Sequence, residues 1–158
     1  MAEERLQRIT VAIDGSPYGA AALAFAIDLA RHYGSQLVVL AVAPIVPVYV
    51  ASNEPYVPAA LPEGEMPRYR AFVDAAVKQA EAAGVSAVTG ICEEGVVVDE
   101  ILSHLEHHPT DLLVVGSRGR SAARRILLGS VSTAMVTHAT CPVLVVRPTT
   151  STPPPGAS

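Results

Sequence analysis

Apolar residues along the chain alternate between short continuous runs and longer stretches with helical spacing. The continuous runs are rich in valine, isoleucine and leucine, which is typical of strands buried on both faces of a sheet. The longer stretches repeat apolar positions every three or four residues, as amphipathic helices do. This pattern predicts five strands, over residues 9–14, 36–43, 86–92, 111–115 and 142–147. It predicts four helices between them, over residues 18–33, 68–83, 96–107 and 130–138.

Strands that alternate with helices predict one domain of the α/β class with a mainly parallel sheet, because each helix carries the chain back across the sheet. Two segments depart from the alternation. Residues 43–66 form a long connection with five prolines, which indicates a functional or mobile loop. Residues 149–158 are of low complexity and predict a disordered tail, so the domain is expected to span residues 1–148.

The composition excludes several classes of protein. With 158 residues, 50% of them hydrophobic and 16% charged, the chain can bury a full core, unlike a disordered or collagen-like chain. Its two cysteines lack the spacing of a disulfide framework or a zinc site, so we expect small apolar side chains in a reducing compartment. The absence of a signal-like or membrane-spanning apolar segment predicts a soluble, cytoplasmic protein.

The charged residues are distributed unevenly. The formal net charge is −4, yet all 15 acidic residues lie at or before Asp111. Residues 112–158 contain five arginines and no acid, and four of those arginines fall between Gly116 and Gly129. A basic segment in a mildly acidic protein indicates one small anionic ligand. The negative total and the 4% aromatic content argue against nucleic-acid binding.

Asp14 ends the first predicted strand, before the turn Gly15-Ser16. An aspartate there can cap the following helix, or it can accept a hydrogen bond from a ribose hydroxyl or hold a metal. If the first and fourth strands are neighbours, Asp14 and Gly116 face each other across a crevice, with Val42 as an apolar wall. Ligands of open α/β sheets bind at such a point.

The fourth strand is followed by glycines and serines in an order that predicts a phosphate site. Gly116 and Gly119 allow a sharp turn and a close approach of backbone N–H groups to a ligand. Ser130 and Ser132 open the next helix, whose unpaired N–H groups and positive dipole end favour an anion, and their hydroxyls add donors. The alternative is ordinary turn glycines beside solvated arginines. The motif is neither a P-loop nor a dinucleotide fingerprint.

These residues resemble the universal stress protein family, specifically its ATP-binding branch. The family motif G-x2-G-x9-G-[S/T] is matched by Gly116, Gly119, Gly129 and Ser130. The opening ITVAIDGSPYG and the closing HATCPVLVVRP also resemble the ends of the family's domain. The similarity therefore spans about residues 8–148, leaving out the variable 43–66 loop and the tail. The resemblance implies a three-layer α/β/α sandwich with a five-stranded parallel sheet in the order 3-2-1-4-5. This is a Rossmann-like fold of the adenine nucleotide α-hydrolase type.

The resemblance also implies a ligand and its site. ATP, or another adenine nucleotide, would bind with Mg²⁺ or Mn²⁺ held through its phosphates rather than by a protein metal site. Ala12, Asp14 and Val42 would hold the base and ribose, and Ala12 stands where some relatives have proline. The family also forms homodimers through its last strand, here Val143–Arg147. The residues implied for the phosphates are Gly116, Ser117, Arg118, Gly119, Arg120, Ser121, Ala122, Gly129, Ser130, Val131 and Ser132.

The sequence offers no convincing catalytic group. Asp14 is the one carboxylate expected near the motif, and it is assigned to the ribose, so hydrolysis is expected to be slow at most. His104 and His108 have i,i+4 metal-ligand spacing, but without a third ligand we expect a solvated helix end. The function predicted is a nucleotide-responsive regulatory module of the stress response. The alternative is a nucleotide-independent dimeric interaction protein of the same fold, and the downstream protein partner is not identified.

Overall fold

The computed structural model describes residues 6–45, 64–119 and 128–148. Within them, strands and helices follow one another in the predicted order. Most of the 43–66 connection and the 149–158 tail lie outside the described residues, so the predictions made for them stay predictions. The elements are β1 Arg8–Ile13, α1 Pro17–Tyr33, β2 Gln36–Pro44, α2 Met66–Ala82, β3 Val88–Gly95, α3 Val97–His107, β4 Leu112–Gly116, α4 Ser130–His138 and β5 Val143–Val146.

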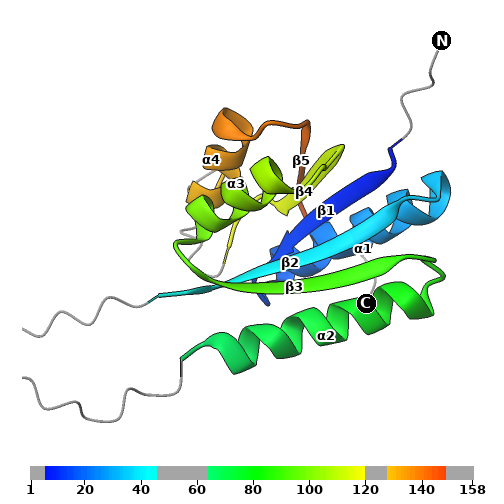
Figure 1. Ribbon diagram of the computed structural model, residues 1–158, viewed down its shortest axis with the longest axis horizontal. Helices are drawn as coiled ribbons and strands as arrows, with labels where there is room; N and C mark the ends of the chain where they lie inside the picture. The colour runs from blue at the N-terminus through cyan, green and yellow to red at the C-terminus, as the bar shows by residue number, and fades with distance from the viewer. Residues whose placement is uncertain (1–5, 46–63, 120–127, 149–158) are drawn as a thin grey trace, which may run out of the picture.

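The strands form one parallel sheet in the order β3-β2-β1-β4-β5, which confirms the predicted order 3-2-1-4-5. Helices α1 and α2 pack against one face, and α3 and α4 against the other, so the three-layer arrangement is also confirmed (Figure 1). β2 contributes to both layers. Val39 and Ala41 belong to the core under α1 and α2, whereas Leu40 and Val42 belong to the core under α3 and α4. Burial on both faces explains why β2 is apolar almost throughout.

The order of strands reverses at β1, which has β2 on one side and β4 on the other. Val11 of β1 pairs with Val39 of β2 and with Val114 of β4. β1 and β4 therefore end near each other, with Asp14 following β1 at the edge where Gly116 ends β4, whereas β2 continues three residues past Ala41, the partner of Ile13. Figure 1 shows α2, α3 and α4 starting at this same edge, on the left of the view. A parallel sheet has its natural ligand crevice at such a reversal.

The third strand differs from its predicted bounds. The apolar pattern ends at Cys92, but β3 runs on to Gly95, and Glu93 and Glu94 pair with Val42 and Ala43 of β2. Both glutamates are exposed, because β3 is an edge strand. An edge strand tolerates charged side chains, because it is paired on one side only. The two glutamates interrupt the apolar pattern, so the pattern did not predict this part of the strand.

Both cysteines and the glycine that ends α1 lie within the described residues. Cys92 and Cys141 are free thiols that pack against the two cores, and burial raises the pKa of both. The Cys92 thiol lies 3.5 Å from the Met66 sulfur. No helix in the described part of the chain has the length and apolar character needed to cross a membrane. Gly34 ends α1 in the left-handed region, with φ +67°, as predicted.

Candidate functional site

A cavity of about 270 Å³ lies at the carboxyl edge of the sheet, where β1, β2 and β4 end. The starts of α2, α3 and α4 also contribute to it. One part of its wall is apolar, and the rest combines a carboxylate, an arginine, glycines and a helix N-terminus. The lining residues are Ala12, Ile13, Asp14, Gly19, Leu40, Val42, Pro44, Tyr69, Val97, Ile101, Val115, Gly116, Arg118, Gly119, Ser130, Val131 and Ser132.

Asp14 has two distinct environments for its two carboxylate oxygens. Its Oδ1 accepts a hydrogen bond from the backbone N–H of Ser16 at 2.9 Å, which shapes the turn after β1. The helix cap itself is Ser16, whose Oγ accepts from the N–H of Gly19 at 3.1 Å. The Oδ2 of Asp14 faces the loop after β4, since a Cβ added at Gly119 would lie 3.1 Å from it. One oxygen is thus committed to the turn, and the other is directed toward the cavity.

The motif glycines are needed for space rather than for unusual backbone angles. A Cβ at Gly116 would lie 2.8 Å from the carbonyl carbon and oxygen of Tyr18, so β4 could not approach α1 with a larger residue there. A Cβ at Gly129 would lie 3.2 Å from the Cα of Arg118. Neither these glycines nor Gly119 has a positive φ. These glycines therefore allow close packing within the protein without a left-handed backbone, and the expected approach of their backbone N–H groups to a ligand stays a prediction.

Ser132 holds the two ends of the β4–α4 loop together. Its hydroxyl lies 3.0 Å from the carbonyl oxygen of Ser117 and 3.1 Å from that of Gly129, and it can donate its one proton to either. The Ser117 carbonyl also accepts from the N–H of Gly129 at 2.7 Å. Ser117 in turn donates its N–H to Val146 of β5 at 2.9 Å. The buried Ser132 hydroxyl thus bonds within the loop, and its expected role as a phosphate donor stays a prediction.

The start of α4 supplies backbone donors to the cavity. The first intrahelical bond runs from the N–H of Thr133 to the carbonyl of Gly129 at 3.0 Å. The N–H groups of Ser130, Val131 and Ser132 precede it and have no acceptor within the helix. They lie at the positive end of the helix dipole, on the same cavity wall as Arg118. This arrangement suits a bound anion.

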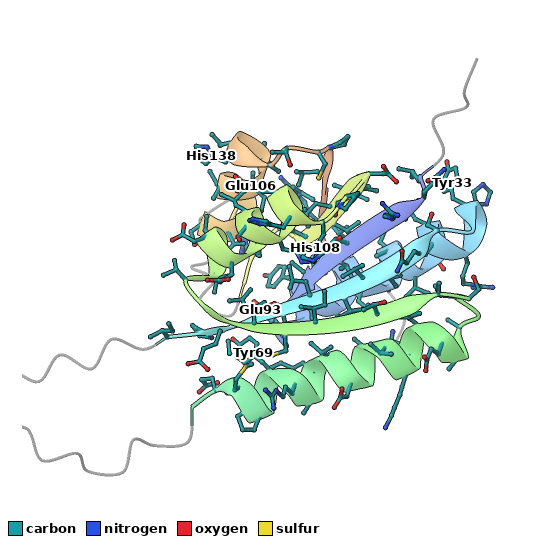
Figure 2. The ribbon with its side chains drawn as sticks, in the orientation of Figure 1. Tyr33, Tyr69, Glu93, Glu106, His108 and His138 are labelled. Atoms are coloured by element: carbon teal, nitrogen blue, oxygen red, sulfur yellow. The ribbon has the colours of Figure 1, made fainter. Side chains whose placement is uncertain are left out.

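The apolar part of the cavity is mostly absent from the sequence prediction, which named only Ala12 and Val42 there. Tyr69 is the largest of the missing residues, and Figure 2 shows it between the start of α2 and the sheet. Its place in the first turn of the predicted second helix could have indicated that it reaches the cavity, because helices that follow parallel strands begin at the edge of the sheet where ligands bind. The other apolar residues missed are Ile13, Leu40, Pro44, Val97, Ile101 and Val115.

The remaining sequence-predicted residues divide into two groups. Ser117 and Gly129 are not part of the cavity lining, although the backbone bond between them joins the two described ends of the β4–α4 loop. Arg120, Ser121 and Ala122 lie outside the described residues.

His104 differs from its expected place at a solvated helix end. The residue is only 6% exposed, and its Nε2 atom is buried without a hydrogen-bond partner in the described part of the structure. Its ring stacks on that of the exposed His108, with 4.4 Å between centroids. Burial lowers the pKa of His104, and the neighbouring His108 lowers it further. His104 lies one helical turn after Ile101, a cavity residue.

The described residues contain no group of three or more side chains suited to hold a metal ion. Asp14 is the one carboxylate among the described lining residues, and a single carboxylate is a weak site for a divalent cation. A metal ion in this cavity would therefore depend on phosphate oxygens of a bound ligand.

Comparison with known proteins gives consistent results. The model of the universal stress protein family matches residues 5–147. The universal stress protein YxiE of Bacillus subtilis is 36% identical over 147 residues, which cover 89% of this chain and 98% of YxiE. The structure of universal stress protein UspA from Lactobacillus plantarum aligns with a TM-score of 0.70 at 23% identity, covering 92% of this chain and 100% of that one. A universal stress protein in complex with cAMP aligns with a TM-score of 0.67 at 27% identity, covering 91% and 98% of the two chains.

Proposed function

The chain belongs to the universal stress protein family, and from this premise we propose that its cavity binds an adenine nucleotide, with ATP as the first ligand to test. The proposal rests on the composition of the cavity lining. An apolar part, a carboxylate oxygen, an arginine and an open helix N-terminus follow one another along the same edge of the sheet. These are the groups that a base, a ribose and a phosphate chain require. The similar structure with bound cAMP supports the choice of an adenine nucleotide.

Each part of the ligand has matching groups in this chain. The base would lie against two apolar residues of β2 that line the cavity, Leu40 and Val42. The ribose hydroxyls would donate to Oδ2 of Asp14, whose other oxygen is already bonded to the turn. The phosphates would lie near Arg118 and the N–H groups that begin α4. A bound Mg²⁺ or Mn²⁺ would neutralise phosphate charge, and its ligands would be phosphate oxygens and water.

The proposed role is regulatory, with hydrolysis slow at most. A hydrolase needs a group that orients or activates water against the terminal phosphate. Asp14 is the one described lining residue with a carboxylate, and the proposed ribose contact uses its remaining oxygen. Nucleotide occupancy would then act by changing the surface around Arg118 and Gly119 that is presented to other proteins.

We also propose a homodimer that forms through β5. β5 is an edge strand, paired with β4 on one side only. Val143, Leu144 and Val145 are apolar and only partly buried in the single chain. A second copy would cover them, and light scattering during size-exclusion chromatography measures whether it does. Replacing Leu144 with lysine should shift the protein to monomer, whereas a wild-type monomer would contradict the proposal.

Mass spectrometry of the small molecules released by denaturing freshly purified protein tests the proposed ligand. An adenine nucleotide at a stoichiometry approaching one per chain is expected. If no nucleotide is released and none binds when added, the remaining candidate is a nucleotide-independent interaction protein that acts through β5. That candidate predicts that a change at Gly119 alters neither stability nor function.

A further inference from the structure

Tyr69 is the one aromatic side chain among the described residues that line the cavity. It lies in the first turn of α2, where its N–H donates to the carbonyl of Glu65 at 3.1 Å. The residue is only 4% exposed, and Figure 2 shows it between α2 and the sheet, at the edge where the strands end. α2 lies outside the glycine motif, so the features that predict the phosphate site give no information about this residue.

The ring of Tyr69 is held by contacts that lead back to Asp14. It packs edge-on against Phe72, with 5.4 Å between centroids and 65° between planes. Phe72 is covered by the guanidinium of Arg68, 5.7 Å from the ring centroid. Phe72 also packs on Gly15, where an added Cβ would lie 2.4 Å from the ring. Gly15 directly follows Asp14, so the Tyr69–Phe72 pair packs against the turn that contains the Asp14 carboxylate.

The strand order places Tyr69 at the end of the cavity opposite the anion donors. The order β2-β1-β4 runs from Pro44, at the end of β2, past Asp14 to Ser130 at the start of α4. α2 packs on β2 and β3, so Tyr69 belongs to the β2 end. With the phosphates at α4 and the ribose at Asp14, the base would lie at the end that contains Tyr69.

We propose that Tyr69 contacts the base of the bound nucleotide and makes the cavity favour a nucleotide over a bare polyphosphate. This inference rests on the proposed function. An aromatic ring beside a base contributes a dispersion and stacking contact that a phosphate chain alone cannot use. Such contacts are worth about 1–3 kcal/mol, which corresponds to an affinity ratio of roughly 5 to 150.

The test compares ATP with tripolyphosphate, a ligand that has the phosphates but no base. Affinities for both are measured by calorimetry, or by competition where binding is weak, for wild type, Tyr69→Leu and Tyr69→Phe. The leucine variant should lose about tenfold or more in ATP affinity and retain its tripolyphosphate affinity. The phenylalanine variant, which keeps the ring, should bind ATP nearly as wild type does. If the leucine variant fails to fold, Tyr69→Met provides a second non-aromatic side chain.

Val73→Ala is the matched control for a general loss of stability. Val73 lies one turn further along α2, is 5% exposed and belongs to the same core, but it does not line the cavity. This variant should melt earlier without changing the ratio of ATP to tripolyphosphate affinity. Equal ATP affinity in wild type and Tyr69→Leu, or an equal loss for both ligands, would overturn the inference alone. Wild type that binds neither ligand would overturn the proposed function as well.

Discussion

Gly119 and Asp14 are in near contact across the carboxyl edge of the sheet, because a Cβ added at Gly119 would lie 3.1 Å from Oδ2 of Asp14. The two residues follow neighbouring strands and are 105 positions apart in the sequence. Their proximity brings the carboxylate next to the loop that leads to α4. The proposed ribose and phosphate contacts therefore meet at this point of the cavity.

Replacing Gly119 with valine should abolish stabilisation by ATP while leaving the ligand-free protein close to wild type. The added side chain enters the cavity beside Oδ2 of Asp14, and the backbone at Gly119 has no left-handed φ that only glycine tolerates. Thermal melts with and without ATP measure both effects. Gly64→Val is the matched control, since nothing lies within 4 Å of a Cβ at Gly64. An unchanged ATP shift in the Gly119 variant would contradict the assignment.

Replacing Gly116 with alanine should destabilise the protein itself, even without ligand. The new Cβ would lie 2.8 Å from the backbone of Tyr18, so β4 and α1 would have to separate. Overpacking of this kind costs about 1–3 kcal/mol in the free energy of unfolding. Urea denaturation measures the loss, and wild-type stability would show that Gly116 has no such packing role.

Replacing Ser132 with alanine should lower the free energy of unfolding by about 1–2 kcal/mol. The change removes the buried donor shared by the carbonyls of Ser117 and Gly129. Thr137→Ala on the same helix is a matched control, because the Thr137 hydroxyl makes an exposed bond of 2.9 Å to the carbonyl of Thr133. Its loss should cost less than about half as much. If urea denaturation gives the same loss of unfolding free energy for both variants, the result would contradict the role of Ser132 in holding the two ends of the β4–α4 loop together.

Acid should destabilise the protein through His104. The pKa of His104 is lowered in the folded state, first by burial and then by His108, from an ordinary value of 6.5. Between the lowered pKa and 6.5 the unfolded chain binds more protons, so the free energy of unfolding rises with pH through this window. This contribution is fully present above about pH 6.5 and is lost as the pH falls through the folded-state pKa. Urea denaturation at several pH values measures the slope.

The variant His104→Leu should flatten this slope in the window below pH 6.5. His107→Leu is the control on the same helix end, since His107 is exposed and its Nδ1 lies 2.7 Å from the carbonyl of Ser103. That change should leave most of the slope in place. If the two variants behave alike, the slope does not come from the buried ring.

The sequence predicts the fold well because buried parallel strands are apolar throughout and the helices between them are periodic. The site is predicted where its signal is local, as in Asp14 and the spacing from Gly116 to Ser130. It is missed where the reason lies in another element. The need for glycine at position 116 comes from the backbone of Tyr18, and Tyr69 reaches the cavity from a helix that follows a long connection. The burial of His104 likewise depends on packing that spacing alone does not reveal.

The most direct test of nucleotide binding is a thermal melt of the purified, nucleotide-free protein over a series of ATP concentrations. A ligand at about 100 times its dissociation constant stabilises the folded state by about 2.7 kcal/mol. We expect a melting temperature that rises with ATP concentration in wild type and stays constant in Gly119→Val. A wild-type melting temperature that does not change with ATP, ADP or AMP would contradict it.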